Sequence, residues 1–149
     1  MIVSNTNAVF TSSRFDRTWH PEGGDAHPPP GQTFAIALGD AFSASGIEVS
    51  QMARDCPDPR KLWWEHSYWY MYLTFEKQRY FVQLEPIDKG NLWRVGFSIA
   101  GGFTSLCRSR NSALKMPISL QQRATGIIQS LAHCTDLRWM AEDEAVQLW

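Results

Sequence analysis

A two-residue alternation in Tyr68–Phe75, YWYMYLTF, constrains the fold of this chain more than any other feature. In an extended strand, the apolar residues from Trp69 to Phe75 point to one face and the three tyrosines point to the other. The following run, Arg79–Glu85, alternates in the same way. Alternation of this kind indicates strands with one buried face. We therefore predict an antiparallel hairpin built from these two runs.

The apolar pattern also predicts how these strands pair. A turn at Lys77-Gln78 gives three apolar pairs across the first hairpin: Phe75 with Tyr80, Leu73 with Val82, and Met71 with Leu84. A third strand over 93–99 gives the same result when Val95 lies opposite Val82, which places Arg94 beside Gln83 and Gly96 beside Phe81. A slip of one residue would mix the two faces, which fixes register in half-buried sheets.

Two amphipathic helices flank this meander. The first begins near Thr33 and ends at Gly46, a residue type that favours helix C-termini. The second begins at Ser119, which has capping-box spacing to Gln122. Their predicted apolar stripes are Phe34, Ala37, Leu38, Ala41 and Phe42 in the first helix, and Leu120, Ala124, Ile127, Ile128 and Leu131 in the second.

Shorter strands are predicted at 8–11, 47–51 and 134–140, and the proline- and glycine-rich segment 14–32 is predicted to be irregular. Two helices and one apolar sheet face bury each other. The sequence thus predicts an α+β fold: a two-layer sandwich with an antiparallel β-meander of about four to five strands and two main helices packed on one face. We expect a single domain over 1–149, with an irregular N-terminal segment (1–32) and an α+β core (33–149).

Composition excludes several classes of function. The 149 residues are 44% hydrophobic and carry a net charge of −1, so neither a nucleic-acid nor an anionic-membrane partner is expected. The only basic cluster, Arg108, Arg110 and Lys115, fits a solvated loop. The three cysteines have no CxxC spacing, which predicts reduced thiols and no zinc knuckle. Without a signal peptide or an apolar run of membrane-spanning length, we expect a cytoplasmic protein, and no cofactor is predicted.

The second face of the meander carries tyrosines where lysine, glutamate and threonine are usual. Either the N-terminal segment covers this face with Phe10, Phe15 and Trp19, or the face binds a protein partner. Tyrosine and arginine are enriched in interfaces because they combine apolar area with a polar group. A homodimer is also compatible with this pattern. The candidate partner-binding residues are Tyr68, Tyr70, Tyr72, Glu85 and Arg94 on the sheet, and Glu142, Asp143 and Glu144 in the acidic tail.

Candidates for catalysis are few. His20, Asp25 and His27 lie in one segment with Glu22 and have ligand types suited to a divalent metal, which gives a small metal-dependent hydrolase as the alternative function. A glycine-rich surface loop is the competing interpretation of the same segment. His133 and Cys134 are adjacent, so their side chains should diverge rather than form a nucleophile and base. No nucleophile elbow, phosphate-binding loop or dinucleotide fingerprint occurs.

Short motifs in the order FTS (10–12), PPG (29–31), FAIALGDAF (34–42), GIEV (46–49) and LRW (137–139) resemble a group of small, uncharacterised bacterial α+β proteins. Some members of that group are immunity partners of toxins or secreted effectors. The resemblance therefore implies a non-enzymatic inhibitor that neutralises a cognate toxin. Where that group has a tryptophan loop rich in aspartate and glycine, this chain has CPDPRKLWWEH (56–66), and no functional residues carry over.

Overall fold

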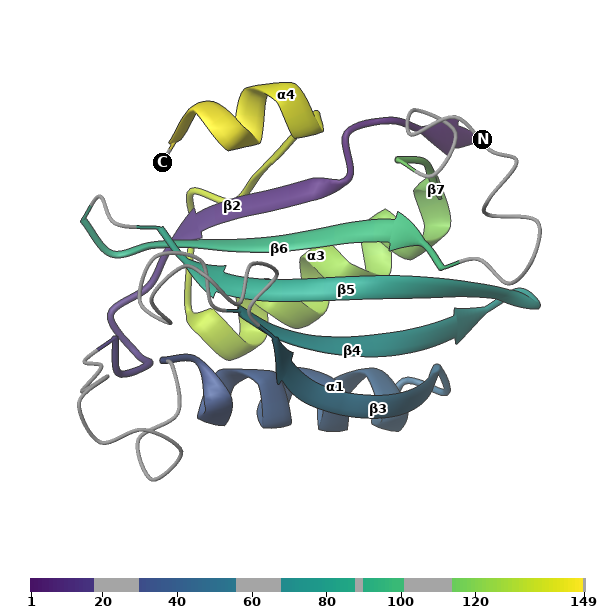
Figure 1. Cartoon of the computed structure of the whole chain (residues 1–149), viewed down its shortest axis with the longest axis horizontal. Coiled ribbons are helices and arrows are strands. Elements are labelled where there is room, and N and C mark those ends of the chain that lie inside the picture. Colours follow the sequence, from purple (N-terminus) through teal and green to yellow (C-terminus); the bar gives the residue numbers. More distant parts are fainter. Residues whose placement is uncertain (18–29, 56–67, 88–89, 101–113, 149) are drawn as a thin grey trace.

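The computed structural model of the chain describes residues 1–17, 30–55, 68–87, 90–100 and 114–148, without the side chains of 53–55. It is an α+β fold in which a six-stranded antiparallel sheet has the strand order β3-β4-β5-β6-β2-β8 (Figure 1). The strands of this sheet are β2 (Asn7–Thr11), β3 (Glu48–Asp55), β4 (Tyr68–Phe75), β5 (Gln78–Pro86), β6 (Leu92–Ile99) and β8 (Arg138–Met140). The remaining elements are β1 (Ile2–Val3) paired with β7 (Met116–Pro117), the helices α1 (Gln32–Ala44), α3 (Ile118–Ala132) and α4 (Glu142–Ala145), and the 3-10 turn η3 (Val146–Leu148). None of the described helices is long and apolar enough to span a membrane.

The core lies between one face of the sheet and the pair α1 and α3, which lie together behind the sheet in Figure 1. On β4 the predicted alternation is confirmed, because Trp69, Met71, Leu73 and Phe75 are buried while the residues between them are half-buried. The buried residues of the helices are Phe34, Ala35, Leu38, Gly39 and Phe42 in α1, and Leu120, Ala124, Ile128 and Ala132 in α3. Both stripes are close to the predicted ones.

The predicted hairpin register is wrong by two residues. The β4–β5 turn is Glu76-Lys77, so Phe75 pairs with Gln78 and Leu73 with Tyr80. Both turn residues have positive φ, 49° and 66°, which is the backbone of a two-residue turn whose twist matches that of the strands. An apolar pattern of period two cannot distinguish registers that differ by two, because the same residues remain on the same face.

The predicted β5–β6 register is also wrong by two residues, in the opposite direction. Val95 lies opposite Leu84, not Val82, and Gly96 lies opposite Gln83. Arg94 therefore lies opposite Glu85 and not beside Gln83. This correction places an acid and a base directly across from each other on the face away from the helices.

The short strand predicted at 8–11 is confirmed as β2, but its place in the sheet was not predicted. Strand β2 pairs with β6 on one side and with β8 on the other, so it lies inside the sheet and extends the meander to six strands. The proposal that Phe10 and Phe15 cover the outer face is wrong. Both pack in the helix-side core, where the Phe15 ring stacks on Phe34 with centroids 4.1 Å apart. Trp19 lies outside the described residues.

Only one of the two predicted helix ends is confirmed. Beyond α1, Gly46 has φ 86°, and the Ile47 amide donates to the Phe42 carbonyl at 3.1 Å, which closes the helix with a Schellman motif. The capping box at Ser119 is wrong, because α3 begins at Ile118 after Pro117 and has no side-chain cap. Instead, the Ile118 amide donates to the Met1 carbonyl at 2.9 Å.

Leu73 tests the assignment of faces. Its side chain is fully buried in the main core, so Leu73→Ala should reduce the free energy of unfolding by about 2–5 kcal/mol through loss of contacts and the cavity left behind. Urea denaturation measures this loss. A loss below about 0.5 kcal/mol, the usual range of a surface substitution, would contradict the burial of this face.

The β4–β5 turn gives a second prediction. Glu76 and Lys77 are exposed residues held at positive φ, where Asn-Gly is the preferred pair. The double change Glu76→Asn and Lys77→Gly should therefore stabilise the protein by about 0.5–1 kcal/mol, measured by the urea midpoint. Asn-Gly placed at Lys77-Gln78 instead should destabilise the protein. If the variant at 77–78 were the more stable of the two, the register predicted from the apolar pattern would be correct after all.

Candidate protein-binding surface

Three tyrosines from β4 and one phenylalanine from β5 form a continuous aromatic strip on the outer face of the sheet, the face away from α1 and α3. The strip consists of Tyr68, Tyr70, Tyr72 and Phe81. The Phe81 ring is the centre, with centroids 5.3 Å from Tyr70, 5.4 Å from Tyr72 and 6.4 Å from Tyr68. All four side chains are half-buried, so each ring keeps an accessible edge or face. The structure thus brings together the three tyrosines that the sequence singles out.

Arg79 closes one end of the aromatic strip. Its guanidinium carbon lies 3.9 Å from the centroid of the Tyr72 ring, and Nη2 donates to Gln51 Oε1 at 3.2 Å. A guanidinium at this distance is attracted by the negative face of the ring, an interaction worth about 0.5–1 kcal/mol at an exposed site. Arg79 therefore holds the Tyr72 ring in place and adds one exposed charge to an otherwise uncharged strip.

Arg94 lies at the other side of the outer face, at the centre of a buried polar network. Its Nε donates to Asn7 Oδ1 at 2.7 Å, and its Nη1 donates to Glu85 Oε1 at 2.5 Å. Nη2 donates to both carboxylate oxygens of Glu142, at 3.0 and 2.8 Å. We call Asn7, Glu85, Arg94 and Glu142 the Arg94 network. It joins β2, β5, β6 and α4 through one guanidinium.

Gly96 makes room for this arrangement. A Cβ at this position would lie 2.7 Å from Asn7 Oδ1, closer than Cβ atoms approach other atoms, and a tight 3.1 Å from Arg94 Nη2, so the Asn7 side chain would have to move. Because Gly96 follows Arg94 by two residues on the same face of β6, its missing side chain lets the arginine lie along its own strand. The network therefore depends on glycine at this register position.

The network holds two carboxylates for one guanidinium. Burial raises the pKa of Glu85, Arg94 opposes this by attraction and hydrogen bonding, and the nearby Glu142 raises it further. Glu85 and Arg94 have exposed fractions of only 5% and 6%. The prediction that these two residues lie exposed on the outer face is therefore corrected: they stabilise the fold from inside, together with Glu142.

A groove runs beside the Arg94 network on the outer face. A cavity of about 270 Å³ is lined by residues of β5 and β6 together with Leu114 and Glu142. A second cavity of about 560 Å³, between Ser4, Lys115 and α4, shares the lining residues Leu114 and Glu142. We call these two adjacent cavities the outer groove. Glu142 lies at their junction, with its side chain 21% exposed.

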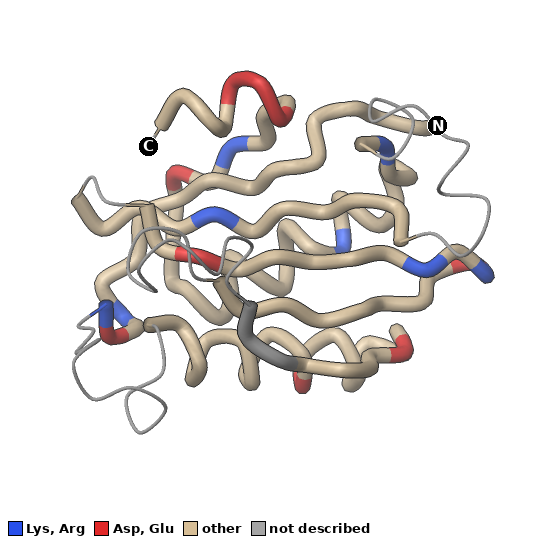
Figure 2. Tube along the Cα trace, viewed as in Figure 1, with Lys and Arg blue, Asp and Glu red and all other residues tan. Residues whose placement is uncertain are grey.

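The acidic tail forms α4 and η3, which pack on the outer face at the β2–β8 end against Val9, Ile87 and Met140. Figure 2 shows its acidic residues as one red stretch above the sheet. Glu142 pairs internally with Arg94, whereas Asp143 and Glu144 are exposed. Of the three predicted acidic contacts, Asp143 and Glu144 thus remain available for a partner in full and Glu142 in part.

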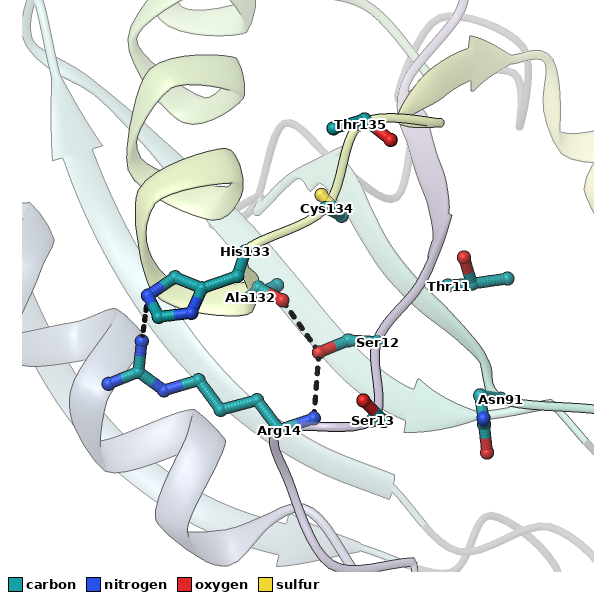
Figure 3. A pocket seen from close by; sticks show the side chains of 9 residues that line it. All are labelled: Thr11, Ser12, Ser13, Arg14, Asn91, Ala132, His133, Cys134 and Thr135. Atoms are coloured by element: carbon teal, nitrogen blue, oxygen red, sulfur yellow. Dashed lines mark hydrogen bonds between the residues drawn. The ribbon is translucent and has the colours of Figure 1, made fainter.

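A third cavity, of about 530 Å³, lies at the C-terminal end of α3 (Figure 3). There the His133 ring points away from Cys134 and contacts the Arg14 guanidinium through Nε2. Burial raises the pKa of the Cys134 thiol, with a smaller contribution from Asp136, which disfavours the reactive thiolate. The two residues do not form a nucleophile and base, in agreement with the divergence predicted from their adjacency.

The predicted metal ligands His20, Asp25 and His27 all fall in the segment 18–29, outside the described residues. Within the part of the chain that the structure describes, no group of three His, Cys, Asp or Glu side chains is close enough to hold a metal ion. Comparisons of this chain with protein-family models, with curated proteins and with solved structures found no match.

The Arg94 network generates a prediction about stability. Arg94→Met leaves the buried carboxylate of Glu85 without its partner, which should cost about 3–5 kcal/mol of unfolding free energy. Glu85→Gln keeps an oxygen acceptor for Nη1 and removes one of two negative charges, so it should cost much less. The double variant, Arg94→Met with Glu85→Gln, should be more stable than Arg94→Met alone. Urea denaturation of the two single variants and the double variant measures this difference. If Arg94→Met alone and the double variant lose the same unfolding free energy, Arg94 does not compensate the buried charge of Glu85.

Proposed function

We infer that this protein is a non-enzymatic protein-binding module whose outer sheet face contacts a partner. The observation that carries this proposal is the aromatic strip: four half-buried rings in mutual contact on the sheet face that α1 and α3 do not cover. Tyrosine side chains of this kind are frequent centres of binding energy, because they lose little conformational entropy and combine apolar area with a hydroxyl group. Arg79 and the exposed acids of α4 supply polar contacts at the margin.

The kind of partner follows from charge and from the resemblance in sequence. Strand β4 has no charged residue and the chain has a net charge of −1, which favours a protein over a polyanion. The motifs resemble bacterial proteins that include immunity partners of toxins. We therefore propose an immunity-type inhibitor that neutralises a bacterial toxin or effector by covering its active site, with α4 facing a basic region of that toxin.

The double change Tyr70→Ser and Tyr72→Ser separates a binding surface from a structural one. Because both rings are half-buried, we expect a loss of about 1 kcal/mol per ring in unfolding free energy, against 3 kcal/mol or more for a fully buried ring. Urea denaturation decides between these outcomes. A total loss above about 5 kcal/mol would make the aromatic strip part of the core and remove it as a binding surface.

Partner contact can be tested in cells by placing a photo-crosslinking amino acid at position 70. Ile36, which is 43% exposed on α1 in the opposite layer, is the matched control position. We expect a discrete adduct from position 70 and none from position 36. If the neighbouring gene encodes the toxin, cells that express its product should stop growing, and co-expression of this protein should restore their growth. The double change Tyr70→Ser and Tyr72→Ser should abolish that protection, whereas Ile36→Ser should retain it. Equal adducts from both positions, or protection that survives the tyrosine changes, would contradict the proposal.

A further inference from the structure

We propose that the smaller cavity of the outer groove receives an arginine side chain of the protein partner, held between the Phe81 ring and the Glu142 carboxylate. This inference rests on the proposed function and specifies its chemistry: the partner presents a guanidinium next to the region that covers the aromatic strip. Four observations on the described residues support it.

The first observation is the charge balance. Glu85 and Glu142 share a single guanidinium, so the Arg94 network carries one negative charge more than it neutralises. Glu142 lies on the groove wall and is partly exposed. Both oxygens of Glu142 already accept from Arg94 Nη2, and Oε2 also accepts from Asn7 Nδ2, which leaves one of about four lone-pair sites for a further donor. Among the described residues that line the smaller cavity, Arg94 is the only cation, whereas Lys115 lines the larger one. A cation in the smaller cavity would therefore balance the network, whereas an anion would add a third negative group.

The second observation is size. A cavity of about 270 Å³ is smaller than the roughly 300–1,000 Å³ of typical small-molecule sites. It accommodates one long side chain rather than a free cofactor. Gly96 also lines this cavity and adds no side chain to it, and a Cβ there would displace Asn7 and press on Arg94.

The third observation is the chemistry of the walls. Phe81 provides an aromatic ring on one side, and Gln83 and Ser98 provide oxygen atoms that accept hydrogen bonds. A guanidinium stacks on aromatic faces while its edge donates to carboxylate and amide oxygens, whereas the lysine ammonium is a compact, strongly hydrated charge. The combination of ring, amide and carboxylate therefore favours arginine over lysine.

The fourth observation is position. Gln83 lies directly opposite Tyr70 on one side and directly opposite Gly96 on the other. The groove is therefore the next row of the same sheet face, and Phe81 belongs both to the aromatic strip and to the groove wall. A partner that covers the tyrosines must also pass over the groove.

Gln83 offers the sharpest test, because it lines the groove and is not part of the Arg94 network. The probe is the capped peptide acetyl-Gly-Arg-Gly-amide, compared with the same peptide carrying citrulline, an uncharged isostere of arginine. Amide resonances of the full chain are followed by two-dimensional NMR. We expect shifts at Gly96 and Ser98 with the arginine peptide and none with the citrulline peptide at the same concentration.

Two charge changes at this one position complete the experiment. Gln83→Lys should weaken binding of the arginine peptide about tenfold, because it places a like charge in the groove, and Gln83→Glu should bind it at least as tightly as the wild type. Asp40→Asn removes an exposed carboxylate on α1, in the opposite layer, and should change the affinity less than twofold. Urea denaturation of each variant shows that the fold is retained. No shift at Gly96, equal response to citrulline, or equal affinity of the two Gln83 variants would overturn the inference.

Failure of this inference can be distinguished from failure of the proposed function. If position 70 crosslinks to a partner but the arginine peptide causes no NMR shifts, the protein-binding surface is supported and the arginine site is rejected. Binding of the arginine peptide without a crosslinked partner would keep the guanidinium site and remove the protein-binding function.

Discussion

The hydrogen bonds of the Arg94 guanidinium hold together β2, β5, β6 and α4 on the outer face of the sheet. From β6 the guanidinium reaches Asn7 in β2, Glu85 in β5 and Glu142 in α4, so the N-terminal strand, two strands of the meander and the acidic tail share one set of hydrogen bonds. Such a buried arginine is held only if its donors are satisfied and its charge is compensated. Because the side chain of Arg94 must reach these partners, its neighbour on the same face of β6 is a glycine, Gly96. The β5–β6 register is therefore determined by the pairing of Glu85 with Arg94 as well as by apolar burial.

The two faces of the sheet are used differently. The helix-side face is closed by α1 and α3 and contains nearly all of the large buried side chains. The outer face contains the aromatic strip, the outer groove and, at its β2–β8 end, α4 with η3. Because β4 contributes alternately to both, Tyr68–Phe75 is at once the centre of the core and the centre of the candidate surface. A substitution at an odd position of this strand therefore changes the core, and one at an even position changes the candidate surface.

The fold was predictable wherever buried residues recur with the period of a strand or a helix in the sequence. The alternation in β4 and β5 identifies the faces, and the stripes containing Phe34 and Leu120 identify the helices. The registers were not predictable, because a pattern of period two allows a shift of two, and Glu76-Lys77 has no residue typical of its turn. The role of β2 was missed because a short strand carries no sign of which strands flank it. The tyrosines of the candidate surface could be named from the sequence, but the burial of Glu85 and Arg94 depends on the corrected register.

The insertion of β2 between β6 and β8 also has a kinetic consequence. The hydrogen bond from Asn7 to Glu142 joins residues 135 apart in the sequence, and those from Thr11 to Asp136 join residues 125 apart. Closing such long loops costs chain entropy before any contact repays it, and folds rich in distant pairs therefore cross their folding barrier slowly. The meander β4-β5-β6 contains the shorter-range pairs and is the natural nucleus. We expect β6 to remain an open edge until β2 docks on it, so that the search of the N-terminal strand limits how fast the outer face forms.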